Sequence, residues 1–156
     1  FDILAPNWDK QLLLAQFIQS ELKKNLGLEA VIQPFDHKTF RAQLDIHAYA
    51  SFEGSWGADY PDPDNFLSVF LSDSGNNRTT WKNSSYDRLI LEARTLMNSK
   101  QREKKYFEAQ KILLEQEVVL VPLYYEPNKA LVRPRASGVE LNPLNYLLLR
   151  KVNVES

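Results

Sequence analysis

The first third of the chain carries the pattern that most restricts its fold. Residues 1–5 are mostly apolar and predict a short strand, which Pro6 and Asn7 then break. Residues 8–26 predict an amphipathic helix, because apolar side chains recur at three- and four-residue steps. These are Leu14, Ala15, Ile18, Leu22 and Leu26. Gly27 stands where a left-handed C-terminal cap belongs, and residues 28–33 predict a second strand. Strand, helix and strand in so short a span predict a βαβ unit with parallel pairing, and hence an α/β fold.

Further elements follow this unit along the chain. Residues 38–44 predict a short helix, and residues 46–56 are apolar and aromatic enough for a strand. Pro61 and Pro63 end that strand, because proline fixes φ and lacks a backbone donor. A helical turn is expected over residues 64–70, followed by a polar loop over 72–80.

The second half of the chain predicts two helices and then two strands. Ser84 or Ser85 is expected to cap the first helix and Ser99 the second. Their apolar stripes are Tyr86, Leu89, Ile90, Ala93 and Met97, then Tyr106, Ala109, Ile112 and Leu113. Residues 118–125 and 130–133 predict strands joined by a turn at 126–128, and residues 138–154 are too mixed to assign.

Composition excludes several classes of function. The net charge is -1 with no run of Lys or Arg, which argues against a nucleic-acid partner. The absence of cysteine excludes disulfides, thiolate metal sites and a cysteine nucleophile, but fixes no compartment. The chain starts at Phe1 inside an apolar run, which is typical either of a piece of a longer protein or of a processed terminus.

Motifs for catalysis or metal binding are weak. His37 and His47 make a poor zinc site without cysteine, and no phosphate-binding glycine loop or nucleophile elbow occurs. Asp59, Asp62 and Asp64 could in principle ligate calcium or hydrolyse a glycoside. Aspartates beside prolines are more often helix caps and turn formers. We therefore predict no catalytic residue, no metal and no cofactor.

The aromatic residues around Asp59 are more informative. Trp56, Tyr60, Phe66 and Phe70 lie close to this carboxylate in the sequence. A carboxylate between aromatic walls suits a cationic ligand group. The alternative is the end of a core strand with a capping aspartate, and the residues alone leave both open.

Residues 55–67 resemble the C-terminal lobe of the dipeptide/oligopeptide-binding proteins, extracellular solute-binding proteins of family 5 that serve ABC importers. Residues 19–28, 38–40, 72–77, 86–87, 121–125 and 142–144 agree in the same order. The resemblance implies one lobe of a two-lobed, class II periplasmic-binding-protein-like fold, with a mixed sheet flanked by helices. It implies that residues 1–125 form the C-terminal ligand-binding lobe of a longer protein. Residues 126–156 would be a tail leading back toward a missing N-terminal lobe.

The resemblance also implies roles for individual residues. Asp59 would hold the α-ammonium group of a peptide, and the main chain of Trp56, Gly57 and Ala58 would pair with the peptide backbone, with Tyr60 completing the motif. Pockets for side chains would be lined by Trp56, Tyr124 and Tyr125. His37 stands where some members carry a tryptophan, and Glu53 replaces a basic residue.

The implied function is capture of oligopeptides for an ABC importer, without catalysis, in the periplasm or otherwise outside the cytoplasm. The full-length protein could carry a lipid anchor. Its partners would be the peptide, the importer's membrane subunits and the missing lobe. Alternatives on the same scaffold are a nickel complex, haem or a sugar as ligand, or a sensory role. A carboxylate-based hydrolase is a further alternative.

Overall fold

The chain is known from a computed structural model that describes residues 1–47, 49–142 and 144–154. It divides into two compact units. Phe1–Trp56 and Gly75–Thr80 form the first, here named the sheet unit, and Gly57–Ser74 with the chain from Trp81 onward forms the second, the helical unit. Pro143, part of one stretch used for the resemblance, lies outside the described residues.

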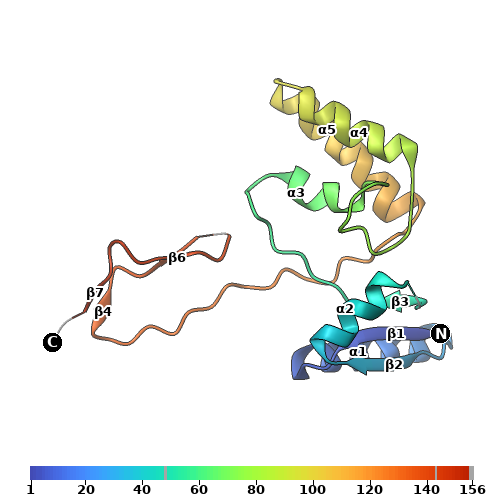
Figure 1. Cartoon of the computed structure of the whole chain (residues 1–156), viewed down its shortest axis with the longest axis horizontal. Helices are drawn as coiled ribbons and strands as arrows, with labels where there is room; N and C mark the ends of the chain where they lie inside the picture. Colours follow the sequence, from blue (N-terminus) through green and yellow to red (C-terminus); the bar gives the residue numbers. More distant parts are fainter. Residues whose placement is uncertain (48, 143, 155–156) are drawn as a thin grey trace. The chain divides into compact units, whose positions relative to one another are not determined.

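The sheet unit is built on a βαβ core, as the sequence predicts. Its elements are β1 (Asp2–Pro6), α1 (Asp9–Leu26), β2 (Val31–Phe35), α2 (His37–Asp45) and β3 (Ser51–Phe52). The strand order is β2-β1-β3, and both pairings are parallel, so this sheet does not show the expected mixed pairing. The crossover from β1 to β2 through α1 and the crossover from β2 to β3 through α2 run in opposite directions across the sheet. Because such crossovers are right-handed, α1 and α2 lie on opposite faces of the sheet (Figure 1).

Local signals explain where the helices of the sheet unit begin and end. Gly27 adopts φ 66°, and its N–H closes the end of α1 on the carbonyls of Leu22 and Lys23. Asp36 caps α2 by accepting hydrogen bonds from the backbone of Lys38 and Thr39. The capping fixes α2 so that Phe40 and Leu44 bury against Leu4 of β1.

The strand expected over residues 46–56 is mostly absent, and only Ser51 and Phe52 pair with β1. Ile46 is the C-cap of α2, and His47 turns the chain with a φ of 52°. The chain therefore joins the sheet only at Ser51. Glu53 adds one further backbone hydrogen bond to β1, since its N–H donates to the Leu4 carbonyl at 2.9 Å.

The helical unit contains the helices predicted for the second half of the chain. Its elements are α3 (Pro63–Leu67), the 3-10 turn η1 (Ser68–Phe70), α4 (Ser84–Thr95), α5 (Ser99–Lys111) and the π-helical turn η2 (Ile112–Gln116). The core joins both predicted stripes with the α3 region. It consists of Leu67, Leu71, Tyr86, Ile90, Ala93, Tyr106, Ala109 and Leu113. Met97 was expected in this stripe but is fully exposed, because α4 ends at Thr95.

The predicted helix caps are each one or two residues too late. Asn83 caps α4 by accepting hydrogen bonds from the backbone of Ser85 and Tyr86. Asn98 caps α5 by accepting one from Gln101. Asparagine and serine cap equally well, so sequence alone does not separate adjacent candidates.

The two strands predicted over residues 118–125 and 130–133 are not formed. Residues 117–135 contain no strand and are almost all exposed. Two short antiparallel pairs follow, β4 (Ala136–Ser137) with β7 (Asn153–Val154) and β5 (Glu140–Leu141) with β6 (Leu147–Leu148). An apolar segment becomes a strand only when another strand pairs with it. Among the described helices, none is both long and apolar enough to cross a membrane.

Candidate ligand site

The turn before α3 is fixed by an ion pair. Asp62 is the N-cap of α3 and accepts a hydrogen bond from the Asp64 N–H at 2.8 Å. Arg102 of α5 donates two hydrogen bonds to the same carboxylate, one to each Asp62 oxygen and each 2.7 Å long. This bidentate geometry is the strong form of a carboxylate–arginine pair. It ties the proline turn to α5.

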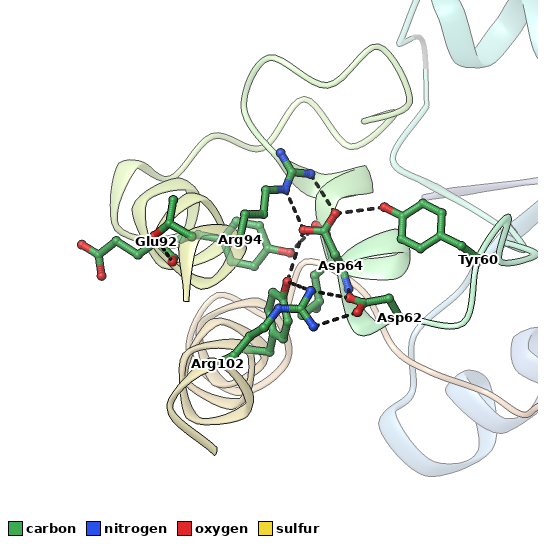
Figure 2. A network of polar contacts seen from close by, with 10 residues as sticks. Tyr60, Asp62, Asp64, Glu92, Arg94 and Arg102 are labelled. Carbon is green, nitrogen blue, oxygen red and sulfur yellow. Dashed lines mark hydrogen bonds and ion pairs between the residues drawn. The ribbon is translucent and has the colours of Figure 1, made fainter. Parts of the chain in front are cut away.

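A second carboxylate, Asp64, lies at the centre of the network in Figure 2 and is only 7% exposed. Arg94 of α4 donates from Nε at 2.7 Å and from Nη2 at 3.0 Å. The hydroxyls of Tyr60 and Tyr106 donate to it at 3.0 and 3.4 Å. A buried carboxylate is stable when its oxygens are satisfied in this way.

Electrostatics agrees with this structural role. Hydrogen bonds from Arg102 hold the pKa of Asp62 below its usual range, although burial partly opposes them. The hydrogen bond from Tyr60 to Asp64 raises the pKa of the Tyr60 hydroxyl. Both arginine pairs connect the turn to the helices, and sequence analysis missed them because nothing in the spacing links Arg94 or Arg102 to an aspartate 30 or 40 residues away.

Asp59 differs from its two neighbours. It is exposed, and no described residue pairs with its carboxylate. Its backbone N–H donates to Oδ1 of the buried Asn65 at 3.2 Å, which holds the main chain in place. The interpretation as a helix cap therefore applies to Asp62, whereas Asp64 lies within α3 and is bound by Arg94. Within the described residues, there is no group of three or more His, Asp or Glu side chains that could hold a metal ion.

The aromatic residues around the motif are accessible. Trp56, Tyr60 and Phe66 are between 39% and 45% exposed. Phe70 instead packs against the core of the helical unit. Trp56 ends the sheet unit and Tyr60 belongs to the helical unit, with its hydroxyl turned to Asp64 (Figure 2).

The other predicted site residues lie in different settings. His37 begins α2 and stacks on Trp8, with ring centroids 5.6 Å apart and planes 11° apart. Tyr124 and Tyr125 lie within residues 117–135, which form no helix or strand, and they are 51% and 99% exposed. No described interaction joins either tyrosine to Asp59.

Three side chains follow the three parallel strands at the carboxyl edge of the sheet. Trp8 follows β1, His37 follows β2, and Glu53 follows β3. In open parallel sheets ligands bind outside this edge. The sequence did not predict that Glu53 lies at this edge. The signal that could have indicated it is a charged residue directly after an apolar strand.

Glu53 is the least satisfied carboxylate of this edge. Its Oε2 is buried and has no hydrogen-bond partner among the described residues. Burial raises the pKa of the Glu53 carboxyl, and the positive charge of Lys10 only partly opposes this. Gly54 keeps the following backbone close to Phe52, because a Cβ there would lie 3.1 Å from the Phe52 ring.

A parallel sheet with helices on both faces, joined to a helical unit that carries an exposed carboxylate, defines a lobe of the periplasmic-binding-protein type. The profile of the bacterial extracellular solute-binding proteins, family 5 Middle, matches residues 1–78. The chain therefore belongs to the family 5 extracellular solute-binding proteins.

Individual relatives agree with this assignment. The chain is 32% identical to the periplasmic oligopeptide-binding protein OppA of Salmonella typhimurium over 99% of its length. It is 30% identical to the probable deoxycholate-binding periplasmic protein YgiS of Escherichia coli over 100% of its length. It spans 28% and 29% of these two curated relatives.

Solved structures show the same fold. Haemophilus influenzae OppA in complex with RPPGFSPFR superposes with a TM-score of 0.89 at 26% identity, covering 99% of this chain and 30% of that one. The Escherichia coli murein tripeptide binding protein MppA superposes with a TM-score of 0.86 at 27% identity, covering 98% and 30%. The expected lobe of a periplasmic-binding-protein-like fold is thus confirmed.

Proposed function

We propose that this chain is part of the solute-binding receptor of an ABC importer and captures oligopeptides by their main chain and α-ammonium group. The family membership and the names of its relatives support a binding role without catalysis. The observation that carries the proposal is the difference among the three aspartates. Arginines engage Asp62 and Asp64, whereas the Asp59 carboxylate is exposed and has no partner in the described chain.

Asp59 suits the role of ammonium anchor for a physical reason. Its backbone is held by Asn65, and the turn that follows is fixed by two arginine pairs. The main chain that carries the carboxylate is therefore already in place before a ligand binds, which lowers the entropic cost of binding. A charge-assisted hydrogen bond to an α-ammonium group contributes about 1.5–3 kcal/mol net. The backbone of Trp56, Gly57 and Ala58 would pair with the peptide as an added strand does.

The rest of the assignment follows from the same proposal. Residues 1–125 would supply one wall of the cleft, and residues 126–156 would lead toward a second lobe that supplies the other wall. Trp56, Tyr60, His37, Tyr124 and Tyr125 would contact the peptide. The receptor would work outside the cytoplasm and deliver peptide to the importer's membrane subunits.

Asp59→Asn in the full-length protein is the direct test. Because asparagine keeps the shape and removes the charge, we expect peptides with a free amino end to lose at least tenfold in affinity by calorimetry. The Asp73→Asn variant is the matched control, since Asp73 is an exposed aspartate of the same unit. Equal binding of free and N-acetylated peptides by the native protein would rule out Asp59 as the anchor.

A non-peptide solute is the second candidate, and one comparison favours it. The relative named for deoxycholate matches this chain about as well as the one named for oligopeptides. Mass spectrometry of the solute that co-purifies with the full-length protein separates the two. A bile acid or another compound without an amide backbone would replace the peptide assignment.

A further inference from the structure

The side chain of Asn65 holds the loop that carries Asp59. Asn65 lies in α3 and is 5% exposed, so its amide group is withdrawn from solvent. Its Oδ1 accepts a hydrogen bond from the Asp59 N–H at 3.2 Å. A buried amide oxygen needs a donor, because leaving it unpaired costs free energy. Here the donor is the main chain of the residue that is proposed to bind the ligand.

Asn65 also contacts the residue that follows Asp59. The hydrogen bond to Asp64 raises the pKa of the Tyr60 hydroxyl, and a side-chain hydrogen bond from Asn65 partly opposes this rise, as a donor to the phenol oxygen does. The same hydroxyl donates to the Asp64 carboxylate at 3.0 Å, and Arg94 donates to that carboxylate twice (Figure 2). The amide of Asn65 is thus connected through Tyr60 to the Asp64–Arg94 pair.

The chain from Tyr60 to Asn65 is closed by its own backbone. The Asp62 N–H donates to the Tyr60 carbonyl at 2.9 Å, and the Asn65 N–H donates to the Asp62 carbonyl at 3.1 Å. Asp59 precedes these contacts, and among the described residues its hydrogen bond to Asn65 is the one that holds it. All of these residues belong to the helical unit, so the arrangement does not depend on the sheet unit.

We infer that Asn65 is a positioning residue for the Asp59 carboxylate and thereby contributes to recognition of the amino end of a peptide. The inference rests on the proposed peptide function and deepens it, since it names the residue that orients the anchor. Without the Asn65 acceptor the main chain at Asp59 would have more freedom, and fixing it on binding would cost more entropy. A peptide with a free amino end should therefore lose more affinity than a peptide without one.

The direct test compares tetra-alanine with N-acetyl-tetra-alanine by calorimetry on the full-length protein. The ratio of the two affinities isolates the amino end, because the rest of the two peptides is the same. We expect the native protein to prefer the free amino end and Asn65→Ala to reduce that preference by at least about threefold. In an Asp59→Asn background, Asn65→Ala should leave the ratio unchanged, since no charged anchor is left to orient.

Asn98→Ala is the matched control, because the Asn98 side chain caps α5 in the same unit and accepts its hydrogen bond from Gln101, outside the Asp59 loop. This variant should keep the preference for the free amino end despite its lower stability. An equal loss of affinity for both peptides in Asn65→Ala would show a purely structural role and overturn the inference.

The same measurements separate the inference from the function on which it rests. If the native protein binds both peptides equally, Asp59 is not the anchor, and the proposed capture of the ammonium group fails together with the inference. If the native preference is clear but survives in Asn65→Ala, only the inference fails. If neither peptide binds, both are wrong.

Amide hydrogen exchange of the native full-length protein gives a second measurement in case Asn65→Ala does not fold. The hydrogen bond to Asn65 should make the Asp59 N–H exchange at least about tenfold more slowly than in an unfolded chain. Exchange at the unfolded rate would overturn the inference, because the main chain at Asp59 would then not be held.

Discussion

Asp59, Asp62 and Asp64 are close in sequence, but their carboxylates have three different surroundings. Asp62 caps α3 and pairs with Arg102, and Asp64 is buried against Arg94 and two tyrosine hydroxyls. Asp59 is exposed and holds the chain only through its N–H. The two engaged residues make the turn rigid, and the free one is the candidate for ligand binding.

The Asp62–Arg102 pair predicts a dependence of stability on pH. The pKa of Asp62 is lowered in the folded state relative to about 3.9 in the unfolded chain. The pair therefore stabilises the fold above that value, and the stabilisation is lost as the pH falls through the lower folded pKa. We expect Asp62→Asn to cost about 1–2 kcal/mol at pH 7, because asparagine still caps the helix but no longer carries the charge.

Urea denaturation followed by circular dichroism between pH 7 and about pH 2 measures this effect. The difference between native protein and Asp62→Asn should shrink below about pH 4. Asp73→Asn, at an exposed position, should show little difference at any pH. A gap between native and Asp62→Asn that stays constant with pH would show that the charge pair is not its source.

At the scale of single elements, the buried stripes of helices α4 and α5 were predicted correctly, but the residues that cap their N-termini were not. Their buried stripes follow the predicted spacing, since Tyr86, Ile90 and Ala93 face Tyr106 and Ala109 in one core. Their first residues are serines, but the capping oxygens come from Asn83 and Asn98. The stripe is repeated over several turns, whereas a cap is a single residue.

We expect Asn98→Ala to lower the free energy of unfolding by about 1 kcal/mol, because the Gln101 N–H loses its acceptor. Ser99→Ala should have a much smaller effect, since Ser99 is the first helical residue and not the cap. Urea denaturation of the two variants in parallel makes the comparison. A larger loss of unfolding free energy in Ser99→Ala would show that Ser99, and not Asn98, caps the helix.

At the scale of the whole molecule, residues 117–135 depart most from the sequence prediction. They are rich in apolar and β-branched side chains, but they form no strand and are almost all exposed. A lone strand has no ladder to join, so its hydrogen bonds remain with water. A second lobe would supply the missing partner if the proposed two-lobed receptor is correct.

This segment predicts a site of early proteolysis in the 156-residue chain. Trypsin should cut after Lys129 well before it cuts within α5, because Lys129 is exposed and lies outside any helix or strand, whereas the sites in α5 lie in a packed helix. Mass spectrometry of the products over time identifies the order. Cleavage within α5 first would show that the segment is better protected than the structure indicates.

The sequence by itself determined the elements whose signal is local and repeated. The βαβ start, the Gly27 cap, the stripes of α4 and α5 and the short helix at residues 37–45 all depend on spacing along one stretch of chain. The motif around Asp59 was also visible in the sequence, because its resemblance to the family extends over consecutive residues.

Only the tertiary structure decided which charged groups are engaged. The pairs of Asp62 with Arg102 and Asp64 with Arg94 join residues far apart in sequence, and the position of Glu53 beside Leu4 depends on strand order. Pairing and burial are set by what packs against a residue in space. For that reason the sequence could single out Asp59 as a candidate ligand residue, but it could not show that arginines engage Asp62 and Asp64, or that Oε2 of Glu53 has no hydrogen-bond donor among the described residues.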